Sequence, residues 1–175
     1  MANVILIGFM GVGKTRLGRA LAKRWAWPFV DLDEEVEAQA GCTIPELFAR
    51  DGEPAFRRRE ADALGRILGG DGQILATGGG TPTAPGSMEN MLARGRVVWL
   101  RATWKTILER VPRDGTRPLL GGLSRVQAQA RIQELLEARR PCYAMASMTI
   151  DVDHREETEL VEALIDGLTE LGVGP

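Results

Sequence analysis

Residues 8–15 read Gly8-Phe9-Met10-Gly11-Val12-Gly13-Lys14-Thr15, and the rest of the predicted architecture builds outward from this octapeptide. It follows a short apolar run at 3–7, which predicts a buried strand, and precedes a run at 16–25 whose apolar residues recur at helical spacing. A Gly-x-x-x-x-Gly-Lys-Thr loop between a strand and a helix is typical of a phosphate-binding loop, or P-loop. Its glycines let successive amides turn inward around phosphate oxygens, and the positive end of the following helix adds to the attraction.

The second half of this loop has expected contacts with a bound nucleotide and its metal ion. The amides of Gly11, Val12 and Gly13 are predicted to surround the phosphates. Lys14 is expected to reach the β- and γ-phosphates, and the Thr15 hydroxyl to bind Mg²⁺. The alternative is a plain glycine turn, but the chain holds only three lysines, so a lysine at this position favours phosphate binding.

Composition indicates an ordinary soluble domain. The chain has 175 residues, of which 44% are hydrophobic and 26% charged, and its formal net charge is −2. That charge gives no reason to expect a nucleic acid or an anionic membrane as a partner. The sequence shows no apolar run of membrane-spanning length and leaves no room for a signal peptide before the first strand. Cys42 and Cys142 fit neither a metal site nor a disulfide framework, so we expect a cytoplasmic protein.

Strand and helix signals alternate along the whole chain. Strands are predicted at 3–7, 29–31, 73–77, 96–100 and 148–151, and helices at 16–25, 33–40, 44–50, 53–68, 85–94, 103–112, 124–145 and 156–171. Pro141 is expected to break or kink the helix at 124–145. The pattern predicts a single domain over 1–175, an α/β fold with three α/β/α layers around a five-stranded parallel sheet, as in P-loop NTPases.

Ligands of such sheets bind at the carboxyl ends of the strands, and two more of these ends carry suggestive residues. Asp31 and Asp33 follow the second predicted strand and point to the same side of it, where carboxylates suit Mg²⁺ and a hydroxyl substrate. The alternative is that one of the two only caps the next helix. Gly78-Gly79-Gly80 follows the third strand and lets backbone approach a ligand closely, although a plain turn is an alternative.

Three consecutive arginines lie on the helix predicted at 53–68. Arg57, Arg58 and Arg59 point about 100° apart, so at most two can face one pocket, and composition alone favours a solvated surface. Only Arg57 lies three residues before Glu60, which can pair with its guanidinium and fix its orientation.

Two later segments also carry arginines. Arg117 lies in a stretch at 112–122 that is rich in Pro, Gly and Arg and is typical of a closing loop. Arg139 and Arg140 lie near a predicted helix end, where a surface position is the more common reading.

Together these segments resemble the shikimate kinase family, small P-loop kinases related to nucleoside-monophosphate kinases. The resemblance runs in order from about Val4 to Tyr143. It rests on the P-loop, Asp31-Leu32-Asp33, Gly52-Glu53 with Phe56-Arg57 and Glu60, Gly78-Gly79-Gly80, Arg117-Pro118-Leu119-Leu120, and Arg139 with Pro141 and Tyr143.

The resemblance implies transfer of the γ-phosphoryl group of ATP to the 3-hydroxyl of shikimate, with Mg²⁺, in aromatic amino acid biosynthesis. It places Asp33 on the accepting hydroxyl, Arg57 and Arg139 on the substrate carboxylate, and Gly79 and Gly80 in the same pocket. A substrate-binding helical segment at about 33–62 and a lid at about 112–123 are implied as well. Members of the family are commonly monomeric.

For the nucleotide, the resemblance implies Lys14 and the P-loop amides on the phosphates, with Thr15 and Asp31 around Mg²⁺. It implies Arg117 as the lid residue that reaches the phosphates, Arg110 against adenine, and Arg16 and Arg155 among the residues that contact ATP. Many relatives carry a second hydroxyl residue, which can contact the α-phosphate, where this chain has Arg16, so the resemblance does not carry that contact over to this chain.

Two other classes stay open. A different small-molecule kinase, such as a gluconate kinase, would share the P-loop and the lid but gives no reason for pairing Phe56-Arg57 with Arg139. A nucleotide-binding protein without catalytic activity is the second, against which Asp33 and Arg117 argue; the sequence contains no Asn-Lys-x-Asp guanine signature.

Overall fold

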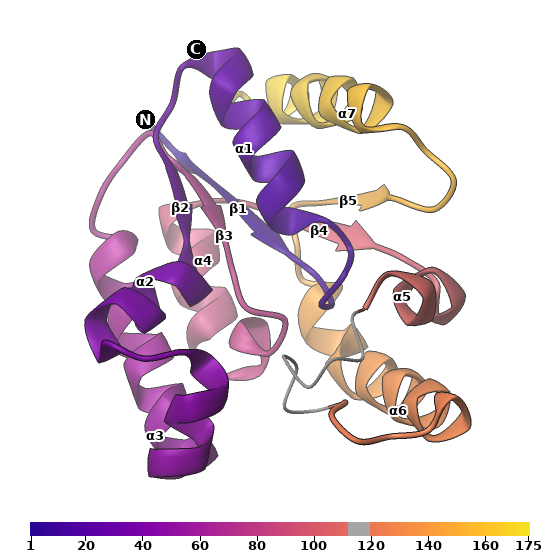
Figure 1. The fold of residues 1–175 in the computed structure, drawn as a ribbon. Helices are drawn as coiled ribbons and strands as arrows, with labels where there is room; N and C mark the ends of the chain where they lie inside the picture. The colour runs from indigo at the N-terminus through magenta and orange to yellow at the C-terminus, as the bar shows by residue number, and fades with distance from the viewer. Residues whose placement is uncertain (112–119) are drawn as a thin grey trace.

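The computed structural model describes residues 1–111 and 120–175, and these form a parallel sheet with helices on both faces (Figure 1). The sheet has the strand order β2-β3-β1-β4-β5. Its strands are β1 (Asn3–Ile7), β2 (Phe29–Asp31), β3 (Ile74–Ala76), β4 (Gly95–Arg101) and β5 (Met148–Asp151). All four neighbouring pairs are parallel, which confirms the predicted fold class.

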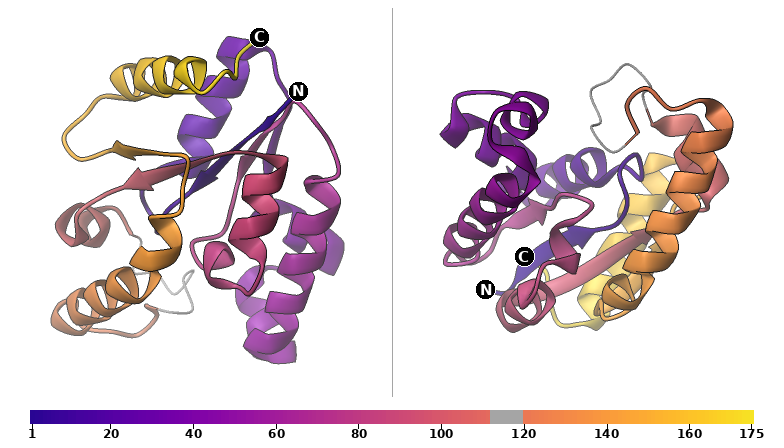
Figure 2. Two further views of the ribbon diagram at one scale, coloured as in Figure 1. Left: turned by 180° about the vertical axis from the view of Figure 1, so that it is seen from behind. Right: turned by 90° about the horizontal axis from the view of Figure 1, so that it is seen from below.

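Seven α-helices and one short 3₁₀ helix connect the strands in the described part of the chain. They are α1 (Lys14–Trp25), α2 (Leu32–Ala40), α3 (Ile44–Ile67), the 3₁₀ helix η1 (Thr81–Thr83), α4 (Ser87–Arg94), α5 (Trp104–Arg110), α6 (Arg125–Tyr143) and α7 (Glu157–Glu170). Helices α1 and α7 cover one face of the sheet, and α3 and α4 pack against the other, as the two directions of view in Figure 2 show.

The central strand divides the core in two because successive side chains of a strand point to opposite faces. Val4 and Leu6 pack with α1 and α7, whereas Ile5 and Ile7 pack with α3 and α4. All four are fully buried, as expected for a parallel sheet covered on both faces. In Figure 1 the arrowheads of β4 and β5 point to the right and that of β1 to the lower right, and both chain termini lie at the upper left.

The structure differs from the predicted elements at two helices. The helices expected at 44–50 and 53–68 join into α3, which bends at Gly52, where φ is 78° and ψ is 169°. Of the break or kink expected at Pro141, the break is wrong, because α6 continues through Pro141 to Tyr143. A proline this near the end removes one amide donor, while the Ala144 amide still bonds to the Arg140 carbonyl at 2.9 Å.

The loop predicted to act as a lid falls mainly outside the described residues. Its positions 112–119, including Arg117, are not among them. Leu120, which is described, is buried against the cluster that α1, α5 and α7 share.

Candidate active site

The P-loop joins β1 to α1 through three glycines in left-handed backbone conformations. Gly8, Gly11 and Gly13 have φ values of 139°, 79° and 96°, which side-chain-bearing residues rarely adopt. Space is a second constraint at Gly8, where an added Cβ would lie 2.4 Å from the Leu100 carbonyl oxygen. The Nζ atom of Lys14 donates to the carbonyl oxygens of Gly8 (2.9 Å) and Phe9 (3.0 Å), so its ammonium lies over the loop. The loop therefore presents amides and a cation together, the arrangement that phosphates require.

Asp31 and Thr15 meet beside this loop. The Thr15 hydroxyl donates to Asp31 Oδ2 at 2.6 Å. The other oxygen, Asp31 Oδ1, accepts from the amides of Asp33 (3.0 Å) and Glu34 (3.4 Å) and so caps α2. The sequence left open which aspartate caps the helix, and the structure assigns that role to Asp31. Both Asp31 and Asp33 line the cavity described next.

These oxygens fit a magnesium ion bound together with a nucleotide. Among the described residues, no group of three or more His, Cys, Asp or Glu side chains could hold a metal ion by itself. Mg²⁺ is commonly bound through one or two protein oxygens, water and substrate phosphates, so Thr15 and Asp31 beside a P-loop are sufficient.

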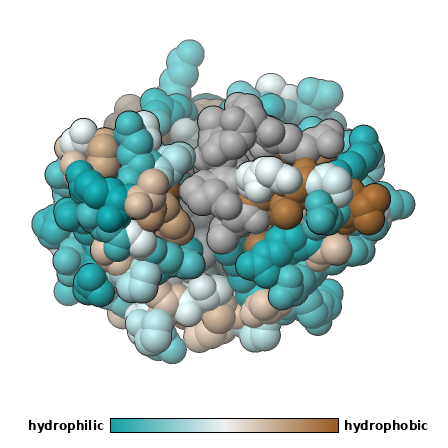
Figure 3. All heavy atoms as spheres, turned by 60° about the horizontal axis from the view of Figure 1, so that its bottom comes forward, coloured by the Kyte–Doolittle hydropathy of each residue, from teal (hydrophilic) through white to brown (hydrophobic). Residues whose placement is uncertain are grey.

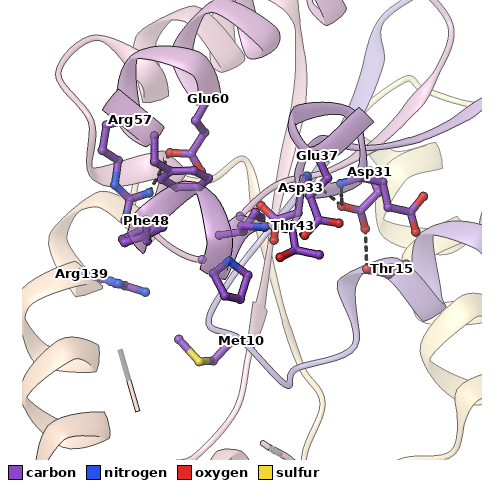
Figure 4. Close-up of a pocket in the computed structure, with 17 residues that line it drawn as sticks. Met10, Thr15, Asp31, Asp33, Glu37, Thr43, Phe48, Arg57, Glu60 and Arg139 are labelled. Carbon is purple, nitrogen blue, oxygen red and sulfur yellow. Dashed lines mark hydrogen bonds and ion pairs between the residues drawn. The ribbon is translucent and has the colours of Figure 1, made fainter. Parts of the chain in front are cut away.

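A cavity of about 550 Å³ opens next to the P-loop at the carboxyl ends of β2 and β3. Figure 4 shows that its walls come from separate parts of the chain, with Arg57, Phe48 and Glu60 on α3, Asp33 on α2 and Arg139 on α6. The segment predicted at 33–62 thus forms one side of the cavity. Around this edge the molecular surface is mostly hydrophilic, with scattered apolar residues (Figure 3).

No helix in the described ranges is long and apolar enough to cross a membrane.

Arg57 is held in place by two carboxylates. Its Nη1 donates to Glu60 Oε2 at 2.7 Å and its Nη2 to Glu53 Oε1 at 3.2 Å. Burial acts to lower the pKa of Arg57, but the charges and hydrogen bonds of Glu60 and Glu53 outweigh it and raise the pKa. Glu60 is only 2% exposed, and its Oε1 accepts from the Thr81 hydroxyl at 2.6 Å.

The arginines next to Arg57 do not share its position. Arg58 and Arg59 are both exposed, whereas Arg57 is half-buried and lines the cavity. This is the division that helical spacing predicted, with Glu60 as the brace.

Arg139 reaches the same cavity from α6. It is 6% exposed, its guanidinium carbon lies 5.2 Å from the centre of the Phe9 ring, and its Nη1 has no hydrogen-bond partner within the described residues. A buried guanidinium nitrogen without an acceptor is rare and points to an anionic ligand. Figure 4 shows the guanidinium groups of Arg57 and Arg139 extending toward the same space.

The glycines after β3 lie close to side chains of the site. An added Cβ at Gly78 would lie 2.7 Å from Glu60 Oε1, and one at Gly80 would lie 2.7 Å from Arg57 Nη2. The backbone of Gly80, with φ −94° and ψ −15°, is ordinary. In this structure the glycines approach the arginine and glutamate side chains of the site itself, and their predicted approach to a ligand stays a prediction.

Three arginines that the resemblance places near ATP contact other parts of the protein in this structure. Arg110 Nη2 donates to the Val152 carbonyl oxygen at 3.4 Å, and Arg155 donates to the Glu159 carbonyl oxygen at 3.3 Å. Arg16 forms an exposed ion pair with Glu157 at 3.1 Å, which the sequence did not indicate.

Sequence reasoning missed several residues that line the cavity. Met10 lies inside the P-loop, so its position in the sequence could have identified it. Phe48 has the spacing of an ordinary core residue, and nothing in the sequence separates it from one.

Comparison with known proteins gives a consistent result. A family model described as Shikimate kinase matches residues 10–169. The shikimate kinase of Symbiobacterium thermophilum is 42% identical over 173 residues, covering 97% of this chain and 98% of that protein. The shikimate kinase of Thermus thermophilus is 45% identical over 166 residues, covering 94% and 89%.

Solved structures agree with these sequence matches. A shikimate kinase from Acinetobacter baumannii, in complex with shikimate, has a TM-score of 0.91 and 34% identity, covering 97% of this chain and 94% of that one. A gluconokinase from Sinorhizobium meliloti has a TM-score of 0.58 at 18% identity, which shows a shared fold alone.

Proposed function

The chain belongs to the shikimate kinase family and phosphorylates shikimate with ATP, and we propose that the cavity beside the P-loop is where the 3-hydroxyl accepts the γ-phosphoryl group. This assignment rests on two arginines that face one cavity. Glu60 holds Arg57 in place by an ion pair, and Arg139 has a buried guanidinium nitrogen with no hydrogen-bond acceptor among the described residues. Two guanidinium groups suit a carboxylate, which shikimate carries.

Asp33 is assigned to the accepting hydroxyl. It lines the cavity between the P-loop and the arginines, and its neighbour Asp31 already supplies the helix cap. A carboxylate there orients the hydroxyl and accepts its proton as the phosphoryl group arrives. Gly79 and Gly80 contribute the adjoining wall, where backbone can approach the substrate.

The P-loop is assigned to the triphosphate. The amides of Gly11, Val12 and Gly13 surround the phosphates, and Lys14 neutralises the charge that develops on the β- and γ-phosphates. Thr15 and Asp31 would hold Mg²⁺, which supplies further charge neutralisation when bound. Arg16, Arg110 and Arg155 stand around the remainder of the nucleotide, and Arg117, outside the described residues, keeps its proposed role on the phosphates.

Because members of the family are commonly monomeric, we propose a monomer as the active species. Both cysteines are free, which supports a reducing, cytoplasmic location.

The assignment is tested by ADP release in a coupled assay with shikimate or gluconate as acceptor. Turnover with shikimate and none with gluconate is expected; the reverse would assign the cavity to the other substrate. Arg57→Ala and Arg139→Ala should each raise the KM for shikimate by about thirtyfold to several thousandfold, with the KM for ATP nearly unchanged.

Arg58→Ala is the matched control, because Arg58 is adjacent, identical in chemistry and exposed. It should change the KM for shikimate by about fivefold at most. Arg57→Lys should recover only part of the loss, since an ammonium cannot make two parallel hydrogen bonds to a carboxylate. If Arg57→Ala proved as mild as Arg58→Ala, the carboxylate would bind elsewhere.

A further inference from the structure

Tyr143 has no role in the mechanism above, yet it contacts the wall of the substrate cavity from behind. It is the last residue of α6 and the only tyrosine of the chain, and it lies four residues after Arg139, on the same face of the helix. Its side chain is fully buried, with its ring centre 5.7 Å from that of Trp99. Its hydroxyl donates to the carbonyl oxygen of Gly79 at 2.5 Å.

This hydrogen bond fixes the direction of one peptide group. The Gly79 carbonyl and the Gly80 amide belong to the same planar trans peptide, so they point in opposite directions. Tyr143 is buried behind the glycines and does not line the cavity, whereas Gly80 does. With the carbonyl turned toward Tyr143, the Gly80 N–H is turned toward the cavity, and it has no protein acceptor among the described residues.

The following peptide behaves differently. The Gly80 carbonyl accepts from the Thr83 amide (3.0 Å) and the Thr83 hydroxyl (2.7 Å), and the Thr81 amide donates to the Gly78 carbonyl at 3.2 Å. Both polar groups of that peptide are thus used within the turn. The Gly79–Gly80 peptide is the one whose amide remains for a ligand, and Tyr143 holds its other end.

We propose that Tyr143 is a positioning residue for the substrate, whose hydroxyl orients the Gly79–Gly80 peptide so that the Gly80 N–H donates to a polar group of bound shikimate. The inference rests on the proposed function only in placing shikimate in this cavity. Burial raises the pKa of Tyr143, with nearby Arg139 acting in the opposite direction, so the hydroxyl is protonated at neutral pH and available as a donor.

The test removes the hydroxyl and keeps the ring. Tyr143→Phe fills the same volume and preserves the contact with Trp99. Without its partner the peptide can rotate, and the substrate loses a fixed donor, so kcat/KM for shikimate should fall roughly tenfold, while the KM for ATP stays within about twofold.

Thr83→Val is the matched control. It removes a hydroxyl from the same turn, but one that bonds to a peptide whose amide is already used by Gly78. A comparable loss in Tm with shikimate kinetics near wild type is expected. If Tyr143→Phe left kcat/KM for shikimate unchanged, or if both variants impaired both substrates equally, Tyr143 would be only a structural residue.

The single tyrosine also allows a test on the unmodified enzyme. Protein labelled at the tyrosine Cζ carbon gives one ¹³C resonance, which should shift on addition of shikimate without ATP, because the peptide bonded to Tyr143 engages the substrate. An unmoved resonance would overturn the proposal even if Tyr143→Phe folded poorly. Wild-type turnover of shikimate would stand in either case, so failure of this inference is distinguishable from failure of the proposed function.

Discussion

Gly80→Ala tests whether the position of the Arg57 guanidinium controls substrate binding. The backbone of Gly80 suits alanine, so the substitution introduces no strain of its own. The added Cβ would instead lie 2.7, 2.8 and 3.0 Å from Arg57 Nη2, Nη1 and Cζ. The substitution therefore places one methyl group against the Arg57 guanidinium.

The size of the effect follows from these distances. Ordinary contact begins at 3.4 Å, so the guanidinium must withdraw by about 0.7 Å. Since it is the far end of a flexible side chain, the movement should cost little stability. Misplacing a binding group by about 1 Å can reduce catalysis by about a hundredfold. We therefore expect kcat/KM for shikimate to fall about ten- to a hundredfold, or about 1.4–2.7 kcal/mol of transition-state stabilisation.

The assay is coupled ADP release with each substrate varied in turn, together with thermal unfolding. The KM for ATP should stay near wild type. Gly65→Ala is the control, because Gly65 lies on the same helix as Arg57, is exposed, and has nothing within 4 Å of an added Cβ. That change should leave kinetics unaltered and add up to about 1 kcal/mol of stability. A wild-type KM for shikimate in Gly80→Ala would refute the link between Arg57 position and substrate binding.

Three further substitutions probe the phosphate side of the site. Lys14→Ala should nearly abolish turnover with little change in Tm, because positioning and charge neutralisation dominate phosphoryl transfer; near-native kcat would contradict the P-loop assignment. Asp33→Asn should lower kcat by about a hundredfold and change KM less, since the acceptor loses its base while Asp31 still caps the helix; native kcat would exclude a role on the hydroxyl. Glu157→Gln should lower the KM for ATP about two- to fivefold at low salt, because it removes a negative charge near the nucleotide and frees Arg16 from its ion pair. A raised KM for ATP would show instead that the ion pair assists ATP binding.

Much of the site could be predicted from the sequence because the motifs that form it lie within short segments. The glycine spacing and Lys14 identify the P-loop between a strand and a helix, and alternating apolar runs predict the parallel sheet. The choice of Arg57 over Arg58 and Arg59 followed from a three-residue spacing to Glu60, and the pair was found at 2.7 Å. Such inferences succeed because the interacting groups lie within one or two helical turns of each other.

Other features depend on groups far apart in the chain. Arg139 faces Arg57 only because α6 and α3 pack at the same edge of the sheet, and by sequence alone its place near a helix end favoured the surface. Asp31, which caps α2 through one oxygen, accepts through the other from Thr15, sixteen residues earlier, and this second bond depends on how α1 lies beside β2. The tertiary structure also decided that Gly80 lies against the Arg57 guanidinium and that Tyr143 bonds to Gly79, because both depend on packing between segments more than twenty residues apart. Local spacing fixes which residues share a face, whereas packing of the faces decides which of them meet.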